Sequence, residues 1–243
     1  MRSFFYAANA FVKSFILFLR PGLWLGFLAK PLTFIGQTIA MSKWISAHPV
    51  KGMNDFFTRK RDFNARYRLY EDVMQQEALH GAEILYMEFG VFKGASFKHW
   101  VKNNTHANSR FYGFDTFEGL PESWGGYGKG AFATPIPDVE GNRHEFVKGL
   151  FQDSLPPFIH AGKVTKEQRK VIHLDADLYS STLYVLTSLA PFLKEGDLIL
   201  FDEFNVPDHE FAAWEHFCKA YYIKFEVLAA VNNYYQIAVK LIN

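Results

Sequence analysis

The sequence predicts an α/β fold, with one seven-stranded, mostly parallel sheet, an antiparallel last strand and a helical N-terminal extension. Short apolar runs rich in β-forming residues alternate with segments of helical periodicity from about residue 84 onward. Such alternation is typical of parallel strands joined by right-handed helical crossovers. The last two runs flank Asn232-Asn233, a sequence that favours a tight hairpin. The length of 243 residues fits one sizeable domain plus an extension.

The extension, residues 1–53, is apolar and basic. Residues 3–19 predict a helix that Pro21-Gly22 ends, and residues 23–29 and 31–44 form further apolar segments. The first 54 residues contain six Lys or Arg and no acid, so their charge of +6 in a total of +1 leaves −5 for the rest. The apolar runs are too short for a clear transmembrane helix, and no cleavage site of a signal peptide stands out.

Two interpretations of the extension remain open. It packs on the main domain or on a second copy of the chain, which would make a homo-oligomer. Alternatively, it lies at a membrane surface, with aromatic residues at the acyl boundary and Lys and Arg at the head groups. We therefore expect a cytoplasmic protein, located at the membrane surface under the second interpretation. The near-neutral charge argues against nucleic acid as a partner.

Residues 53–79 predict one long helix ending near His80-Gly81, because apolar residues recur at helical spacing. Its basic residues are expected on a solvated face, and they are Arg59, Lys60, Arg61, Arg66 and Arg68. This helix opens the main domain, residues 54–243. The lone cysteine, Cys218, excludes an intrachain disulfide, suits a reducing compartment and is expected to be a buried, inert thiol.

The first strand and the turn after it form the segment around which the domain is organised. Residues 84–89 are an apolar run, followed by Gly90 and Gly94 and then by a segment that can start a helix. Glycines let a ligand approach the backbone, and the first N–H groups of a helix attract its anionic part. Alone, this pattern is weak and occurs more often as an ordinary strand–helix turn than as a nucleotide-like binding site.

The following elements repeat the strand–helix alternation. Strands are predicted at residues 110–115, 146–149, 170–177, 196–203, 225–230 and 235–242. Helices are predicted at residues 97–101, 152–160, 179–193 and 209–222, the third broken near Pro191. Residues 122–145 form a long loop rich in Gly and Pro, and a loop of this length is often a lid.

Acidic residues end four of the predicted strands, where parallel strands share one edge of the sheet. They are Glu88, Asp115, Asp175, Asp177, Asp202 and Glu203. So many like charges require basic side chains, helix N-termini or a divalent cation. Ligation by carboxylates suits a hard cation such as Mg²⁺. Taken singly, Asp175, Asp177 and Asp202 could also cap helices. His173 is expected to be a core histidine, and His209 is an alternative base.

Five ordered motifs resemble the macrocin O-methyltransferase (TylF-type) family. They are MEFGVFKGAS at residues 87–96, FDTFEGLP at 114–121, VKGLFQDSLP at 147–156, HLDADLY at 173–179 and FDEF at 201–204. The resemblance runs from about Gly81 to the C-terminus and leaves the extension unmatched. It implies a Rossmann-like class I methyltransferase fold that uses S-adenosylmethionine, commonly with Mg²⁺, to methylate sugar hydroxyls.

The resemblance also implies roles for individual residues. The cofactor would be held by Glu88, Gly90, Gly94, Ser96, Asp115, Leu150, Phe151, Gln152 and Asp153. The metal ligands would be Asp175, Asp202 and Glu203, and Asp177 would be the general base. Glu203 departs from the family, which often has Asp there, so the metal geometry is open. Trp124 and Tyr127, in the long loop, would form a lid over the acceptor.

The function predicted from these roles is O-methylation of a sugar-containing acceptor, a small molecule or a glycan. Mg²⁺ would lower the pKa of the acceptor hydroxyl, Asp177 would remove its proton, and the oxyanion would attack the sulfonium methyl. Two alternatives remain. The acceptor could be a phenol or a catechol, which a metal could also hold. The domain could instead be a non-catalytic methyltransferase-fold module that recruits partners.

Overall fold

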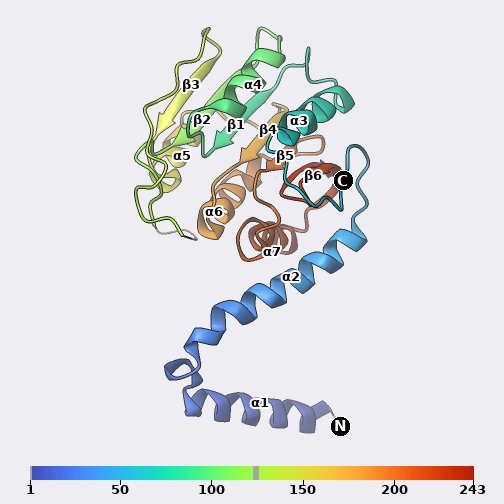
Figure 1. Ribbon diagram of the computed structural model, residues 1–243, viewed down its shortest axis with the longest axis vertical. Coiled ribbons are helices and arrows are strands. Elements are labelled where there is room, and N and C mark those ends of the chain that lie inside the picture. Colours follow the sequence, from blue (N-terminus) through green and yellow to red (C-terminus); the bar gives the residue numbers. More distant parts are fainter. Residues whose placement is uncertain (1, 123–125) are drawn as a thin grey trace.

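The computed structural model describes residues 2–122 and 126–243, and its centre is one seven-stranded sheet (Figure 1). The strand order is β3-β2-β1-β4-β5-β7-β6. Strands β1 to β5 pair in parallel, whereas β7 pairs antiparallel with β5 and β6, so the predicted sheet is confirmed. The strands are β1 (Leu85–Phe89), β2 (Arg110–Asp115), β3 (His144–Lys148), β4 (Lys170–Leu174), β5 (Leu198–Phe201), β6 (Lys224–Val231) and β7 (Gln236–Ile242).

Helices cover both faces of the sheet (Figure 1). Helices α3 and α4 pack on one face, and α5, α6 and α7 pack on the other together with the end of α2. The helices are α1 (Arg2–Leu19), α2 (Ala29–Ala47), α3 (Ala65–Gln76), α4 (Ala95–Asn103), α5 (Phe151–His160), α6 (Tyr179–Leu189) and α7 (Ala212–Tyr221). Short helical turns occur at Pro21–Leu23, Gly26–Leu28, Ala190–Phe192 and Pro207–Phe211.

The strand order reverses at the β1–β4 pair, because β2 continues on one side of β1 and β4 lies on the other. In open α/β sheets, ligands bind beyond the carboxyl ends of the strands at such a reversal. Both strands are buried along their whole length, as expected for central parallel strands. The fold therefore directs attention to the residues that follow Phe89 and Leu174.

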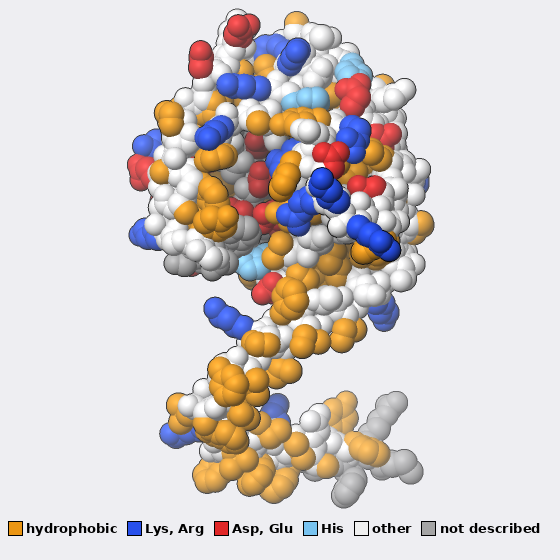
Figure 2. Space-filling view, in the orientation of Figure 1, with side chains coloured by type: hydrophobic (Ala, Val, Ile, Leu, Met, Phe, Trp, Pro, Cys, Tyr) orange, Lys and Arg blue, Asp and Glu red, His pale blue; other side chains and the backbone are white. Residues whose placement is uncertain are grey.

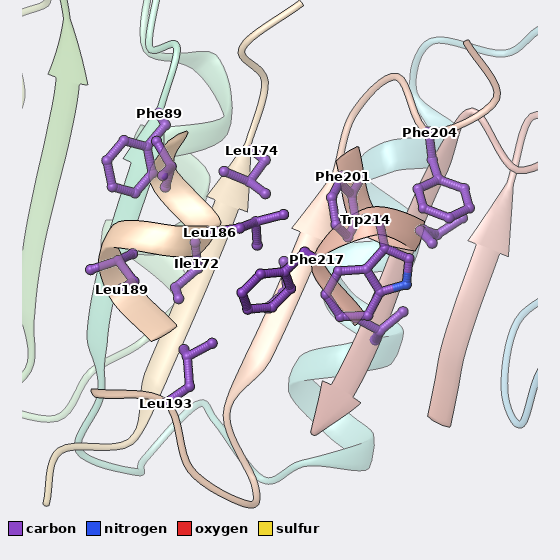
Figure 3. Close-up of a cluster of buried hydrophobic side chains, with 14 of the residues drawn as sticks. Phe89, Ile172, Leu174, Leu186, Leu189, Leu193, Phe201, Phe204, Trp214 and Phe217 are labelled. Atoms are coloured by element: carbon purple, nitrogen blue, oxygen red, sulfur yellow. The ribbon is translucent and has the colours of Figure 1, made fainter. Parts of the chain in front are cut away.

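A packed core supports this edge from behind. Figure 3 shows Leu186 of α6 and Trp214 of α7 among the apolar side chains of the central strands. The indole of Trp214 lies 5.4 Å from the ring of Phe201. The rings of Phe89 and Phe114 stack at 4.7 Å. Close-packed interiors resist deformation, so the strand ends form a rigid base for the site.

The predicted helix over residues 53–79 is wrong in its first half, because α3 begins at Ala65. Residues 50–55 instead run beside the edge strand β6. The Lys51 amide donates to the Val227 carbonyl at 3.0 Å, and the Gly52 amide donates to the Leu228 carbonyl at 2.7 Å. An unpaired strand edge leaves backbone groups without partners, and this segment supplies them. Periodicity in the sequence could not reveal that requirement.

The N-terminal helices project from the globular body (Figure 1). Helix α1 ends where predicted, and Arg20 adopts a left-handed conformation with φ 50° just before Pro21. Residues 29–47 form one continuous helix, since Pro31 lies in its first turn, where its missing N–H removes no helical bond. In α2 only Met41 and Trp44 are buried, and both belong to the core of the globular body. The division at residues 53 and 54 stays a prediction.

Candidate functional site

A cavity of about 790 Å³ lies at the carboxyl ends of the central strands. Figure 2 shows it as a hollow in the globular body with acidic side chains inside. Its lining includes ten of the residues singled out from the sequence: Gly90, Asp115, Tyr127, Leu150, Phe151, Gln152, Asp175, Asp177, Asp202 and Glu203. The chain thus brings together residues that are more than 100 positions apart in the sequence.

Asp115 anchors the turn that follows β1. Its Oδ2 accepts hydrogen bonds from the amides of Val91 and Phe92, both at 2.8 Å, and its Oδ1 accepts one from Phe117 at 2.8 Å. The two bonds to Oδ2 use both of its lone pairs, whereas Oδ1 keeps one, so Asp115 can still accept a hydrogen bond from a ligand through Oδ1. The side chain therefore fixes the loops and faces the cavity at once.

Gly90 is required by the backbone at this point. Its φ of +94° is one that L side chains rarely adopt, and a Cβ there would lie 1.8 Å from the carbonyl oxygen of Asp175. The two central strands therefore meet with no side chain between them directly below the cavity. This close approach leaves the backbone of β1 accessible to a ligand.

Four residues with an implied cofactor role do not line the cavity: Glu88, Gly94, Ser96 and Asp153. Asp153 is exposed in the first turn of α5, and Pro137 of the long loop covers Gly94, where a Cβ would approach Pro137 to 3.0 Å. Glu88 is 1% exposed and accepts a hydrogen bond from the hydroxyl of Tyr86.

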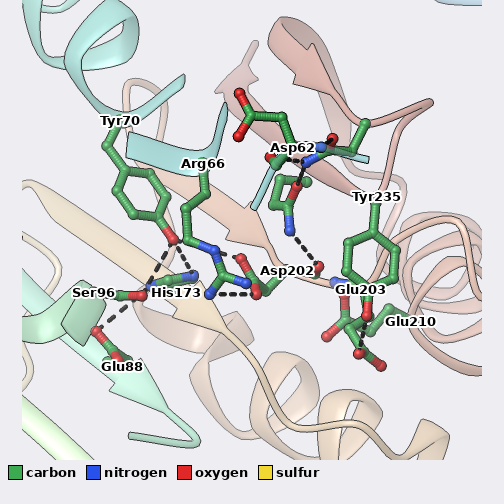
Figure 4. Close-up of polar contacts among 12 residues, drawn as sticks. Asp62, Arg66, Tyr70, Glu88, Ser96, His173, Asp202, Glu203, Glu210 and Tyr235 are labelled. Carbon is green, nitrogen blue, oxygen red and sulfur yellow. Dashed lines mark hydrogen bonds and ion pairs between the residues drawn. The ribbon is translucent and has the colours of Figure 1, made fainter. Parts of the chain in front are cut away.

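Glu88 and Ser96 belong to a buried polar network between the sheet and α3 (Figure 4). The hydroxyl of Tyr86 lies 2.9 Å from His173 Nδ1, and the hydroxyl of Tyr70 lies 3.3 Å from His173 Nε2. Tyr70 also donates to Ser96 Oγ at 3.4 Å. His173 is thus the buried core histidine that the sequence predicted. Buried polar groups of this kind rigidify a core when they are satisfied.

Five carboxylates, which we call the acid cluster, gather on the other side of the cavity. Four of them line it, namely Asp175, Asp177, Asp202 and Glu203, and the fifth, Glu210, lies outside the lining and contacts Glu203. Glu210 was not singled out from the sequence. It is fully buried in the turn before α7, and its Oε2 accepts a hydrogen bond from the Glu203 amide at 3.0 Å. Glu203 also accepts a hydrogen bond from the hydroxyl of Tyr235.

Arg66 is the cation that faces this cluster (Figure 4). Its Nη1 lies 3.0 Å from Oδ2 of Asp202, and its side chain is only 21% exposed. Arg61 also lines the cavity, with its guanidinium 3.6 Å from the ring centre of Tyr235. The expected solvated position is therefore wrong for Arg66, whereas Arg61 is exposed as predicted but lies before α3 and not on a helix. The sequence did indicate this position of Arg66. Arg66, Tyr70 and Val73 are spaced four and three residues apart, so they lie on the same side of α3, which faces the core.

Crowding of the carboxylates changes their acidity. Burial, together with the charge of Asp202, raises the pKa of Asp175 well above its usual range. Burial and the neighbouring Glu203 and Asp202 raise the pKa of Asp177 to about 7. The same causes raise the pKa of Glu210 well above that of an exposed glutamate, with Glu203 the nearest repelling charge. A carboxyl group with a pKa near 7 can both take up and release a proton at neutral pH.

The acid cluster does not form a preformed metal site. Among residues 2–122 and 126–243, no group of three His, Cys, Asp or Glu side chains has an arrangement that could hold a metal ion. Arg66 pairs with Asp202, and Tyr235 occupies one oxygen of Glu203. The donors are nevertheless hard oxygens, and Oε2 of Glu203 and Oε1 of Glu210 are buried without a partner.

His209 holds the backbone beside Asp177. Its Nδ1 lies 2.7 Å from the carbonyl oxygen of Asp177 and therefore carries the proton that it donates. Asp177 itself has φ 57°, a conformation uncommon for residues other than glycine. His209 is thus engaged with the main chain. Cys218 lies away from the cavity lining, and burial raises the pKa of its thiol, so it is unreactive as predicted.

Aromatic side chains of the long loop form the outer wall of the cavity. Tyr127 is 51% exposed, and its ring lies 4.8 Å from that of Phe132. Phe132 in turn contacts Phe92 at 5.9 Å, in the turn after β1. The loop thereby rests on the turn that Asp115 fixes. Trp124, the other predicted lid residue, lies outside the described residues.

Residues 136–235 match the family macrocin-O-methyltransferase (TylF). The match covers less than half of the 243-residue chain, and over this stretch the chain is similar to the family. The matched stretch contains the whole acid cluster and begins within the long loop. The resemblance of the five motifs is thereby confirmed for the stretch from Val147 onward.

One curated relative supports the same assignment. The 8-demethyl-8-(2,3-dimethoxy-alpha-L-rhamnosyl)-tetracenomycin-C 4'-O-methyltransferase of Streptomyces olivaceus is 27% identical over 143 residues, which cover 49% of this chain and 52% of that protein. The chain thus spans about half the length of the curated relative that it matches.

Solved structures show the same class I methyltransferase fold. The calicheamicin methyltransferase CalS11 aligns with a TM-score of 0.58 at 19% identity, covering 85% of this chain and 91% of its own. The O-methyltransferase NovP aligns with a TM-score of 0.53 at 19% identity, covering 73% of this chain and 78% of its own. At these identities the likeness establishes the fold alone, and it confirms the predicted Rossmann-like architecture.

Proposed function

We propose that the protein is an S-adenosylmethionine-dependent O-methyltransferase that acts on a hydroxyl of a sugar-containing acceptor. One observation carries the proposal: a single cavity joins Gly90, Asp115 and Gln152 to the acid cluster. A methyl donor on the first side and a hydroxyl on the second would meet inside it. The TylF family supports the reaction, and the relative that acts on a rhamnosyl tetracenomycin supports a sugar as the acceptor.

We assign the methyl donor to the side of the cavity formed by the turn after β1. Asp115 would accept hydrogen bonds from the ribose hydroxyls, and Leu150, Phe151 and Gln152 would surround the adenine. The backbone at Gly90 would lie against the sulfonium end. Contacts from Gly94 and Ser96 stay predictions. A ligand could reach Gly94 only if Pro137 moved, and it could reach Ser96 only if Tyr70 moved. Contacts from Glu88 and Asp153 also stay predictions.

Asp177 is the proposed general base. With a pKa of about 7 it is half ionised at neutral pH, and its carboxylate takes the proton of the acceptor hydroxyl. The resulting oxyanion attacks the sulfonium methyl in line. The O–CH₃ bond forms as the S–CH₃ bond breaks, and S-adenosylhomocysteine leaves as a neutral thioether that needs no acid. Positioning of the two reactants in one cavity supplies much of the rate.

We also propose that Asp175, Asp202 and Glu203 can bind Mg²⁺, although proton transfer to Asp177 does not require the ion. When bound, such an ion would polarise the acceptor oxygens. It would compete with Arg66, because Arg66 already pairs with the carboxylate of Asp202 that would help to hold the ion. Replacing Arg66 by Gln should therefore strengthen Mg²⁺ binding by about fivefold or more, as judged by calorimetric titration. Absence of Mg²⁺ binding in both proteins would leave a metal-free reaction.

The deciding experiment is calorimetric binding of S-adenosylhomocysteine to the wild type, Asp115→Ala and Asp202→Ala, in Mg²⁺ and in EDTA. We expect binding to the wild type and to Asp202→Ala, and a loss of about tenfold or more in Asp115→Ala because the ribose contacts disappear. Asp138→Ala, which removes an exposed loop carboxylate, is the matched control. No binding to the wild type would overturn the methyltransferase proposal and favour a recruiting module.

The acceptor class is tested separately by methyl transfer to a panel of glycosides and catechols. Turnover with a glycoside whose product carries the methyl group on a sugar oxygen is the expected result. Turnover with catechols alone would leave the methyltransferase intact and overturn the sugar acceptor.

A further inference from the structure

Helix α1 and the first half of α2 expose an unusually large apolar surface. Figure 2 shows hydrophobic side chains spread over both helices below the globular body. Phe11, Phe18 and Leu23 are 71%, 79% and 81% exposed. Water-soluble monomers rarely expose contiguous apolar patches larger than a few hundred Å². A surface of this extent indicates that something covers it.

Helix α1 has two different sides. Phe11, Phe15 and Phe18 follow one another at helical spacing, and the rings of Phe11 and Phe15 stack at 6.3 Å. Asn9 and Lys13 follow one another at the same spacing on another side of the helix. A helix with a broad aromatic side and a narrow polar side that carries a cation is typical of segments that lie in a membrane interface.

The positive charge of this region favours an anionic lipid surface over a second copy of the chain as the partner. The first 54 residues contain no acid, and basic residues recur at Lys13, Arg20, Lys30 and Lys43. Two copies of the chain that covered each other through this surface would bring cations together with no acid from residues 1–54 to pair with them. Anionic head groups would instead attract each of these cations, which strengthens binding by about fivefold for each cation.

The geometry favours a helix that lies on a membrane over one that crosses it. No single helix in residues 2–122 and 126–243 is long and apolar enough to cross a bilayer. The pair Ala8–Leu23 and Gly26–Ala47 passes the test only together, and it bends by 93° at the break. With α2 rising from the globular body, α1 lies across the far end of α2 (Figure 1).

We propose that residues 5–39, which we call the foot, bind the surface of an anionic lipid bilayer. The aromatic side of α1 enters the boundary between head groups and acyl chains, and Trp24 and Phe27 at the bend enter beside it. Lys13, Arg20 and Lys30 remain at the phosphates, since long basic side chains keep their charged ends in water. The foot lies outside the cavity, so membrane binding can be tested independently of the proposed methyl transfer.

The foot is joined to the body through a rigid contact. Trp44, near the C-terminal end of α2, stacks on His48 at 4.5 Å and packs at 5.0 Å from Phe204. Phe204 lies two residues beyond Asp202 of the acid cluster. Binding of the foot to a bilayer would therefore hold the whole domain at the surface in one orientation.

Flotation of the full-length chain with vesicles tests the proposal. One set of vesicles is pure phosphatidylcholine, and the other also contains phosphatidylglycerol. The first variant replaces Phe11, Phe15 and Phe18 by Ser, and the second replaces Lys13, Arg20 and Lys30 by Glu. The matched control replaces three exposed apolar residues of the body by Ser, namely Phe57, Ile136 and Tyr222. Thermal unfolding and binding of S-adenosylhomocysteine verify that each body is folded.

We expect the wild type and the control to float with the anionic vesicles. The serine variant should bind more weakly by about 1,000-fold or more because it loses three buried aromatic rings. The glutamate variant should lose about 100-fold on anionic vesicles and show no difference between the two vesicle types. A wild type that binds neither vesicle overturns the proposal. So does a dimer, seen by light scattering, that the serine variant dissociates, because a second copy then covers the foot.

Discussion

In the acid cluster charged side chains are buried, whereas on the foot apolar side chains are exposed. Glu210 is fully buried and Asp202 is 3% exposed, whereas Phe18 of α1 is 79% exposed. In most folded proteins charged side chains are exposed and large apolar side chains are buried, so both regions depart from the usual arrangement. Each arrangement therefore costs free energy: the acid cluster through buried like charges and the foot through apolar side chains in contact with water.

The acid cluster and the foot differ in what can stabilise them. In the acid cluster, repulsion is reduced by cations or by protons, and Arg66 already supplies part of this. On the foot, neither a proton nor a small ion relieves the cost of the exposed rings, because that cost falls only when water is removed from them. The first region therefore responds to pH and to small ligands, and the second responds only to a large surface. The predictions below test that distinction.

The largest effect is expected at the proposed base. Asp177→Asn should lower kcat by about 10²–10⁴-fold, because the amide cannot take the acceptor proton. Binding of S-adenosylhomocysteine should stay within about twofold of the wild type, since Asp177 acts on the acceptor side. Asp208→Asn, in the helical turn before α7, is the control and should retain activity. Equal activity in both variants would remove Asp177 from the mechanism.

Two tryptophans near the foot should behave in opposite ways. Trp44 is 7% exposed and contacts Phe204, Phe211 and Phe225, whereas Trp24 is 60% exposed. Trp44→Ala should lower the free energy of unfolding by about 3–5 kcal/mol, because it leaves a cavity in the core. Trp24→Ala should change it by less than about 0.5 kcal/mol in the absence of lipid. Denaturant unfolding of both variants makes the comparison, and equal losses would place Trp24 in a packed core.

Activity should rise with pH across the neutral range. The pKa of Asp177 is raised to about 7, so below that value most molecules carry the proton and cannot accept another. We expect kcat to fall about tenfold for each pH unit well below 7 and to level off above about 8. Flotation of the foot should stay constant over the same range, because Lys and Arg keep their charge there. A flat kcat profile would argue against Asp177.

The stability of the body should depend on pH through Glu210. Burial raises its pKa in the folded protein above that of the unfolded chain. The folded state therefore holds its proton longer, and stability is lost as the pH rises above the usual carboxyl range. Each unit of raised pKa corresponds to about 1.4 kcal/mol.

Glu210→Gln removes that dependence while keeping an oxygen for the Glu203 amide. Its melting temperature should exceed that of the wild type more at pH 8 than at pH 5. Glu140→Gln, on the exposed loop, should show no such difference. An equal gain at both pH values would mean that the charge of Glu210 costs nothing.

Most of the fold followed from periodicity, because the parallel strands are nearly continuous apolar runs with acids at their ends. The helix predicted over residues 53–64 was wrong, since the conformation there depends on the open edge of β6, which is more than 170 residues away in sequence. Of the site, Asp115 and Asp177 stood out because each follows a strand. Glu210 and Tyr235 did not, because only the packing of α7 and β7 brings them to Glu203.

Helix α2 has a consequence for any acceptor at a membrane. Its 19 residues form a rod about 28 Å long, fixed to the body at Trp44. A flexible linker of equal length would sample all separations up to about 60 Å. With residues 5–39 on a bilayer, the remaining turns of α2, residues 40–47, would hold the cavity at a fixed distance from the membrane surface. Sugars attached directly at the surface would be out of reach, and those at the end of a stem of matching length would be methylated.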